Sequence, residues 1–301
     1  MTSALNLTAM SERVHPLSLP HVSFEFFPPK SRKMEGALWR EIKRLEPLAP
    51  RFVSVTFGAG GGTRDTTQAT VTRIRQETRL QPAAHLTCVG LTTMEVDDIA
   101  RCYWEADVKH IIALRGDLPG DGSDEVVGER YHSAADLVAG LREVADFDIS
   151  VAAYPEVHPD AASPGADLDN LKRKLDAGAS RAITQFFFDP DLFLDFVERA
   201  RAAGITAPIV PGILPVTNIQ RTISFAERCG ATVPGWLIAL FDGIAPDDEE
   251  TTNLVGAVAA AELCRYLQAR GIEEFHFYTL NRADLTTAIC RILQTPVLTT
   301  P

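Results

Sequence analysis

The segment Val22-Ser23-Phe24-Glu25-Phe26-Phe27-Pro28-Pro29 opens a series of eight short apolar runs, and this series decides the fold. Segments with the apolar spacing of helices separate the runs, which is typical of βα units joined into a parallel sheet. The runs cover residues 22–26, 52–56, 83–87, 109–114, 149–154, 182–187, 209–213 and 275–279. Eight strands predict an α/β fold of the (β/α)8 TIM barrel type, because a doubly wound sheet more often has roughly five to seven. The long gap between Ile213 and Phe275 predicts extra helices between strands seven and eight.

Glu25 stands among phenylalanines, and its surroundings allow two interpretations. With a strand period of two, Phe24 and Phe26 share one face, while Ser23, Glu25 and Phe27 share the other. The carboxylate could therefore face solvent from an alternating strand. It could instead sit in an apolar site that raises its pKa and makes it a general acid. The segment alone leaves both interpretations open.

Composition excludes several classes of protein. The chain has 301 residues, 46% of them hydrophobic, and a net charge of −11. Its strongest basic run is the short Lys172-Arg173-Lys174, so we expect no nucleic-acid partner. The five cysteines show no CxxC spacing, which indicates neither a disulfide framework nor a zinc site.

Targeting and membrane signals are weak along the whole sequence. Residues 1–20 lack a basic start and an apolar core, and the apolar stretch 254–263 is too short to span a bilayer. We therefore expect a cytoplasmic protein without a membrane segment. Residues 1–20 are predicted to form a flexible tail, and residues 21–301 a single barrel domain.

Polar residues gather where the predicted strands end, which is where barrel enzymes carry their chemistry. The residues in question are Glu25, Thr56, His85, Thr87, Arg115, Gly116, Asp117, Tyr154, Glu156, His158, Gln185, Asn281 and Arg282. Arg115-Gly116-Asp117 could serve two ligand groups at once, or it could be an ion pair that caps the barrel mouth. Because loops are polar in any case, this pattern predicts a site without naming a reaction.

Several familiar motifs are absent. The glycine-rich residues 58–63 fit neither a phosphate loop nor a dinucleotide fingerprint, and we interpret them as a permissive turn near the site. His110 and His276 are interpreted as packed barrel residues. Since the sequence has no HExxH motif and no GxSxG elbow, neither a catalytic metal nor a nucleophilic triad is expected.

Six motifs in register closely resemble the methylenetetrahydrofolate reductase family. They are SFEFFPP at 23–29, LRGD at 114–117, YPEVHP at 154–159, ITQFFFD at 183–189, PGILP at 211–215 and FHFYTLNR at 275–282. The resemblance implies a barrel that binds FAD at the strand ends. It also implies reduction of 5,10-methylenetetrahydrofolate to 5-methyltetrahydrofolate at the expense of NADH or NADPH, and a homo-oligomeric enzyme.

The resemblance also implies roles for individual residues. Glu25 matches the general acid, and Asp117 matches an aspartate near flavin and pterin that we expect to stay anionic. For Glu25 to act as an acid near neutral pH, its pKa must rise toward 6 or 7, and the surrounding phenylalanines are expected to supply the necessary desolvation. Thr56, Gln185, Phe225 and Arg282 match the folate side. The flavin contacts are matched by His85, Arg115, Gly116, Tyr154, His158, Asp167, Asn170, Arg173, Lys174 and Ala179.

Two departures from the family pattern bear on these roles. Arg221 stands where bacterial relatives often have glutamine, which leaves donor preference open. The loop 118–133 is longer and more acidic than in many relatives, so the register of Tyr131 as a flavin contact is ambiguous. Two rival functions also stay open: a flavin-independent folate methyl transferase or demethylase on the same barrel, and a non-catalytic barrel.

Overall fold

A computed structural model describes residues 14–15, 19–57, 64–117, 127–294 and 297–298. The glycine-rich residues 58–63 and most of the acidic loop, residues 118–126, lie outside this range. Within the described part of the chain, no helix combines the length and the apolar character needed to cross a membrane.

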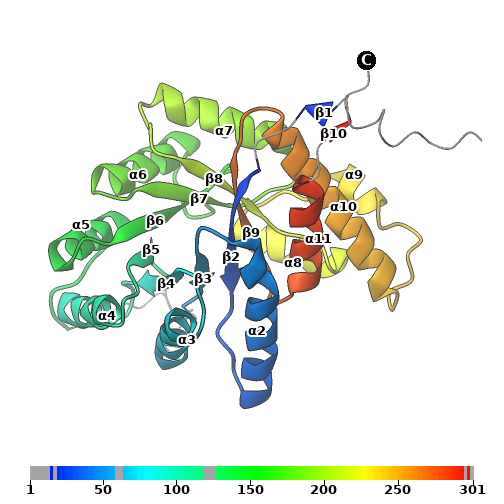
Figure 1. The fold of residues 1–301 in the computed structure, drawn as a ribbon. Helices are drawn as coiled ribbons and strands as arrows, with labels where there is room; N and C mark the ends of the chain where they lie inside the picture. Colours follow the sequence, from blue (N-terminus) through cyan, green and yellow to red (C-terminus); the bar gives the residue numbers. More distant parts are fainter. Residues whose placement is uncertain (1–13, 16–18, 58–63, 118–126, 295–296, 299–301) are drawn as a thin grey trace, which may run out of the picture.

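Eight parallel strands close into a barrel in sequence order (Figure 1). They are β2 (His21–Phe26), β3 (Val53–Val55), β4 (Pro82–Thr87), β5 (His110–Leu114), β6 (Asp148–Ala153), β7 (Arg181–Phe186), β8 (Ile209–Ile213) and β9 (Glu274–Tyr278). The last strand, β9, pairs with the first, β2, and the final pair of this seam is Glu25 opposite Tyr278. The predicted (β/α)8 barrel is confirmed, with strand ends shifted by no more than a residue or two.

Helices surround the barrel, and each strand except β8 is followed by one main helix before the next strand (Figure 1). They are α2 (Arg32–Leu45), α3 (Arg64–Glu77), α4 (Thr93–Glu105), α5 (Ala134–Val144), α6 (Pro164–Asp176), α7 (Pro190–Ala202), α8 (Ile219–Cys229), α9 (Gly235–Ala239), α10 (Glu249–Gln268) and α11 (Ala283–Leu293). A short 3-10 helix, η1 (Glu46–Leu48), follows α2, and β1 (Val14–His15) pairs with β10 (Val297–Leu298). The helices α8, α9 and α10 between β8 and β9 confirm the predicted insertion.

Local signals in the sequence fix where several helices begin. Thr92 and Glu95 form a reciprocal capping box at the start of α4. Ser163 caps α6 and Pro164 occupies its first turn, where a missing N–H costs nothing. Helix α6 carries residues of the candidate site, so this cap helps to set their position.

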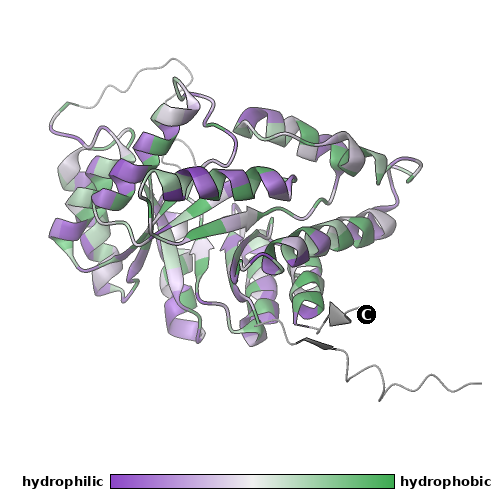
Figure 2. Cartoon of the chain, turned by 90° about the horizontal axis from the view of Figure 1, so that it is seen from above, coloured by the Kyte–Doolittle hydropathy of each residue, from purple (hydrophilic) through white to green (hydrophobic). Residues whose placement is uncertain are grey.

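The core lies mainly between the strands and the helices. Phe24 and Phe26 of β2 are fully buried and belong to the same apolar cluster as Leu38 and Ile42 of α2. In Figure 2 the helices carry both hydrophilic and hydrophobic residues along their length, as amphipathic helices do. Because side chains alternate along a strand, Glu25 faces the barrel interior.

His110 packs near the amino-terminal end of the barrel interior. Its Nε2 lies 2.8 Å from Ser150 Oγ, and its ring meets Phe52 edge-on at 4.4 Å. Arg181 pairs with Asp148 beside it at 2.9 Å. Burial lowers the pKa of His110, so the ring is neutral near pH 7. The interpretation of His110 as a packed barrel residue is confirmed.

Candidate active site

Two cavities adjoin at the carboxyl ends of the barrel strands. The larger has a volume of about 1020 Å³ and the smaller about 220 Å³. Leu114, Ala152 and Tyr154, at the ends of β5 and β6, line both of them. Two ligands, one in each cavity, would therefore lie side by side, and both would contact these three residues.

A carboxylate between two imidazoles forms the polar wall of the smaller cavity. Glu25 Oε2 of β2 lies 3.2 Å from His85 Nε2 of β4 and 3.6 Å from His276 Nε2 of β9. On its other side, His276 Nδ1 lies 2.8 Å from Ser23 Oγ. The Glu25 side chain is 13% exposed and that of His276 is fully buried. Three strands that are distant in sequence thus build one acid–base cluster.

The electrostatics of this cluster contradict the expected pKa shift of Glu25. Burial raises the pKa of Glu25, but the charges and hydrogen bonds of His85 and His276 outweigh burial and lower it to about 2. Phe24 and Phe26 point toward the helices, and only Phe27 of that run lines the cavity of Glu25. The prediction that phenylalanines raise this pKa is therefore wrong. Near pH 7 Glu25 is therefore an anion.

His276 is a packed barrel residue, as predicted, and it also belongs to the cluster around Glu25. It is buried as predicted, yet it lines the smaller cavity and faces Glu25. A sequence signal existed: a closed barrel pairs its first and last strands, and Ser23, Glu25, His276 and Tyr278 all stand at alternate positions of those two strands.

The rest of the lining of the smaller cavity is mostly aromatic and apolar. The rings of Phe186 and Phe225 stack at 5.2 Å with an interplanar angle of 25°. Tyr278 packs its phenol over Gly212 and donates a hydrogen bond of 2.7 Å to Thr184 O. A Cβ on Gly212 would lie 2.6 Å from the Tyr278 ring, so only glycine leaves room for this contact. This lining is suited to a flat, partly apolar ligand.

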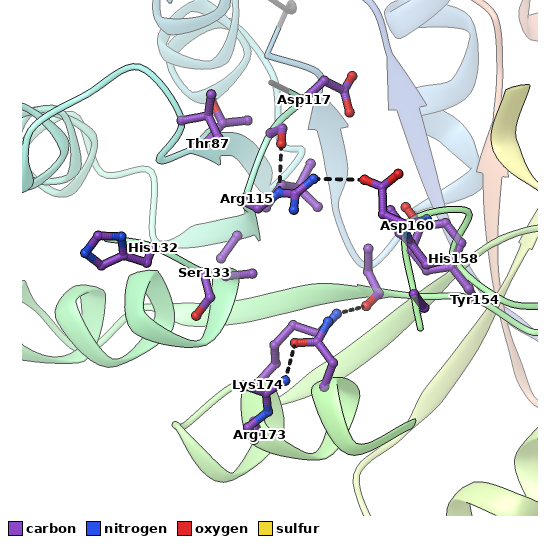
Figure 3. A pocket seen from close by; sticks show the side chains of 18 of the residues that line it. Thr87, Arg115, Asp117, His132, Ser133, Tyr154, His158, Asp160, Arg173 and Lys174 are labelled. Carbon is purple, nitrogen blue, oxygen red and sulfur yellow. Dashed lines mark hydrogen bonds and ion pairs between the residues drawn. The ribbon is translucent and has the colours of Figure 1, made fainter. Parts of the chain in front are cut away.

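The larger cavity has a basic and aromatic lining (Figure 3). Arg115, just past β5, forms an ion pair of 3.2 Å with Asp160. The rings of Tyr154 and His158 meet edge-on at 4.5 Å, and Asp167 accepts a hydrogen bond of 3.0 Å from the His158 N–H. The loop after β6 is therefore fixed by its own side chains before any ligand binds.

Lys174 supplies a buried cation to the same cavity. Its side chain on α6 is 6% exposed, and Nζ donates a hydrogen bond of 2.5 Å to Ala152 O (Figure 3). Burial lowers the pKa of Lys174 to about 8, with Arg173 adding to the effect and Asp167 opposing it. Near pH 7 Lys174 is thus a poorly hydrated ammonium that is available to an anionic ligand.

The structure brings most of the predicted residues to the two cavities. The larger is lined by Arg115, Gly116, Asp117, Tyr154, His158, Asp167, Asn170, Arg173 and Lys174, and the smaller by Glu25, His85, Gln185 and Phe225. His85, predicted as a cofactor contact, lies 3.2 Å from Glu25 in the smaller cavity.

Three predicted residues line neither cavity. Thr56 accepts a hydrogen bond of 2.9 Å from Thr67, and Arg282 forms an ion pair of 3.4 Å with Asp284. Ala179 packs into the apolar core.

Other residues at the cavities were missed from the sequence. They include Arg64, Val89, His132, Ser133, Asp160, Ile112 and Ile183. Some follow strand ends and could have been found that way. His132 and Ser133 could not, because they come from the long loop before α5. Tyr131 itself turns away from the cavity, and its Oη donates to Asp97 Oδ1 at 2.9 Å.

Comparison with known proteins identifies the family to which this chain belongs. A sequence profile described as Methylenetetrahydrofolate reductase matches residues 13–294. The 5,10-methylenetetrahydrofolate reductase of Escherichia coli strain K12 is 53% identical over 274 residues, which cover 91% of this chain and 90% of that protein. The chain belongs to the methylenetetrahydrofolate reductase family. The resemblance in the six motifs is thereby confirmed.

Further methylenetetrahydrofolate reductases and one solved structure extend this comparison. The enzyme of Buchnera aphidicola from Acyrthosiphon pisum is 45% identical, covering 90% of this chain and 91% of that protein. A rice protein named probable methylenetetrahydrofolate reductase (NADH) is 38% identical, covering 86% of this chain and 46% of its own length. A Clostridium thermocellum protein described as binding two copies of 5-methyl-5,6,7,8-tetrahydrofolic acid has a TM-score of 0.62 at 17% identity, covering 97% and 98% of the two chains. That last similarity shows a shared fold. Membership of the methylenetetrahydrofolate reductase family makes the chain an oxidoreductase.

Proposed function

We propose that this chain reduces 5,10-methylenetetrahydrofolate to 5-methyltetrahydrofolate, with FAD in the larger cavity and NADH or NADPH as the electron donor. The observation that carries the proposal is the pair of adjoining cavities, one basic and large, the other holding an acid–base cluster. Their shared lining at Leu114, Ala152 and Tyr154 would let a flavin and a pterin lie against each other. The names of the relatives support the same reaction.

The larger cavity fits a dinucleotide cofactor in size and in chemistry. Its volume of about 1020 Å³ is at the upper end for ligand pockets, as a cofactor of two linked nucleotides requires. Arg173 and the buried Lys174 would hold a pyrophosphate, which the partly dehydrated ammonium binds strongly. Tyr154 and His158 offer ring faces, and Gly116, with φ 91°, has the backbone conformation that favours glycine and packs against Thr87 in the cavity wall. When bound, FAD would accept a hydride from the nicotinamide and pass it to the folate.

The smaller cavity fits the folate. The stacked Phe186 and Phe225 offer an aromatic surface, and the Gln185 side chain brings an amide to the same cavity. Gln185 Oε1 already accepts a hydrogen bond of 3.0 Å from the Phe186 N–H, which leaves its amino group free to donate to a pterin.

Glu25 would supply the proton that the reaction needs. The methylene bridge accepts a hydride only after its five-membered ring opens, and opening requires a proton on the departing nitrogen. The cluster of Glu25, His85 and His276 can hold such a proton on an imidazole and deliver it through the carboxylate. Asp117, at the mouth of the larger cavity, would stabilise the resulting positive charge on the folate.

Colour provides the first test. The purified protein is expected to be yellow, to bleach when mixed anaerobically with NADH or NADPH, and to regain its colour when the folate is added. A colourless protein that needs no flavin would favour the methyl transferase alternative and refute the proposal.

The role of Glu25 has a separate test. Glu25→Gln should retain FAD and bleach normally, but reduce the folate at least ~100-fold more slowly. Glu105→Gln, on the exposed end of α4 and outside both cavities, is the matched control and should behave as the wild type. Near-normal folate turnover in Glu25→Gln would remove Glu25 from the role.

A further inference from the structure

The contact between β2 and β9, which closes the barrel, continues beyond the last residue pair, Glu25 and Tyr278, through side-chain hydrogen bonds. After Tyr278, the Thr279 N–H and Oγ1 both donate to Glu25 O, at 3.3 and 2.6 Å. Asn281 Oδ1 then accepts from the Phe27 N–H at 2.8 Å, and Asn281 Nδ2 donates to Phe27 O at 3.0 Å. The amide of Asn281 thus replaces a strand backbone in pairing with Phe27.

The backbone that presents this amide adopts an unusual conformation. Leu280 and Asn281 are consecutive residues with φ of 51° and 58°. Asparagine tolerates this left-handed region, whereas a bulky residue such as leucine seldom occupies it. The turn is held by hydrogen bonds from Asn281 N to Thr279 Oγ1 and from Arg282 N to Thr279 O, at 3.1 and 2.8 Å. Strained turns of this kind concentrate at functional sites.

Backbone pairing alone could not hold the end of β2 at this point. Phe27 is followed by Pro28 and Pro29, which have no N–H groups to extend a ladder. Phe27 and Leu280 both line the smaller cavity, on either side of the Asn281 contact. Thr279 holds the backbone of Glu25, and Phe26 O accepts a hydrogen bond of 2.9 Å from the Thr56 N–H, so the Asn281 side chain adds the last contact that fixes the chain just beyond Glu25.

We propose that Asn281 is a positioning residue for Glu25: its amide pairs with both backbone groups of Phe27 and so fixes the carboxyl end of β2 against the smaller cavity. Asn281 lines neither cavity, so it acts through Glu25 and does not touch substrate. The inference rests on the proposed function, because it assigns Asn281 to the folate step of that reaction.

Two variants separate the hydrogen bonds from the backbone conformation. Asn281→Gly keeps the left-handed turn accessible and removes both hydrogen bonds to Phe27. Asn281→Asp keeps an acceptor for the Phe27 N–H, but sets an oxygen against Phe27 O and loses the donor. Asp248→Ala is the matched control, because Asp248 also bonds a backbone N–H, that of Thr251 at 3.0 Å, and lines neither cavity.

The kinetic readout distinguishes positioning from general stability. Both Asn281 variants should lower kcat for folate reduction at least ~10-fold, because small displacements of a catalytic group are costly. The KM for folate and the rate of flavin reduction by the nicotinamide should stay within about twofold of the wild type, since neither step uses Glu25. Asp248→Ala should change none of these values. An unchanged kcat, a rise in KM alone, or equal loss of both half-reactions would overturn the proposal.

Amide hydrogen exchange tests the contact without any ligand. In a proteolytic fragment that ends at Pro29, Phe27 carries the last exchangeable amide, since the two prolines have none. Exchange at Phe27 should be at least ~10-fold faster in Asn281→Gly than in the wild type or in Asp248→Ala. Unchanged exchange would overturn the inference. If the wild-type protein does not reduce the folate, the proposed function fails, and the exchange result then decides whether Asn281 holds the end of β2.

Discussion

Glu25 should make the stability of the ligand-free protein depend on pH in a predictable direction. Its pKa falls from an ordinary value of 4.5 to about 2 in the folded protein, where His85 and His276 favour the carboxylate against the cost of burial. A difference of roughly 2.5 units corresponds to about 3 kcal/mol, at 1.36 kcal/mol per unit. Because the folded pKa is the lower one, this stabilisation is present above pH 4.5 and is lost as the pH falls toward 2.

Urea unfolding of the wild type and of Glu25→Gln, both freed of ligands, measures this contribution. The difference in their free energies of unfolding should shrink by about 2 kcal/mol between pH 5 and pH 3. Taking the difference at each pH removes the effect of the other carboxylates, which titrate in both proteins. Glu105→Gln, which changes an exposed carboxylate outside both cavities, is the control for the effect of the substitution itself.

The sign of the change shows whether the folded protein lowers or raises the pKa of Glu25. A difference that grows as the pH falls would mean that the folded protein binds the proton more tightly than the unfolded chain, and hence that the pKa is raised. A constant difference would mean that the imidazoles only balance the effect of burial and do not outweigh it. Either result would refute the reasoning from the geometry of the cluster.

Three further predictions concern other residues. Asp117→Asn should slow folate reduction roughly 10- to 100-fold and alter the rate of flavin reduction, measured by stopped-flow absorbance, and unchanged rates in both half-reactions would contradict the role of Asp117. Lys174→Met should weaken FAD binding at least ~10-fold, measured by fluorescence titration, whereas the control Lys172→Met should not. Binding of FAD to the wild type should weaken above pH 8, because Lys174, with its pKa of about 8, loses its proton there. Gly140→Ala should lower the free energy of unfolding by about 1 kcal/mol. The new Cβ would lie 2.0 Å from Tyr131 Oη, and the cost of this overpacking exceeds the gain in helix propensity. A variant that is more stable than the wild type in urea would disprove this.

Much of the fold follows from local properties of the sequence. The apolar runs place all eight strands, and the capping residues Thr92 and Ser163 mark where α4 and α6 begin. The period of two along β2 separates Phe24 and Phe26 from Glu25. These features are legible because strand alternation and helix capping involve residues that are neighbours in the chain.

The membership of the larger cavity was predictable in part. Nine of the predicted residues line it. Five of them follow strand ends, which a barrel brings to one face, and the other four lie on α6 and were implied by the family resemblance. Loop residues such as His132 and Asp160 were not predicted, since no periodicity governs where a loop side chain points.

The sequence by itself predicted a barrel with polar groups from many strands at its mouth, and left open whether Glu25 faces solvent or an enclosed site. Only the tertiary structure decided the charge of Glu25, because His85 and His276 come from strands far away in the chain and reach its carboxylate only when the barrel closes. The same closure brings Asn281 to Phe27. Electrostatic interactions and hydrogen bonds depend on distances in space, which a linear pattern of residue types does not contain.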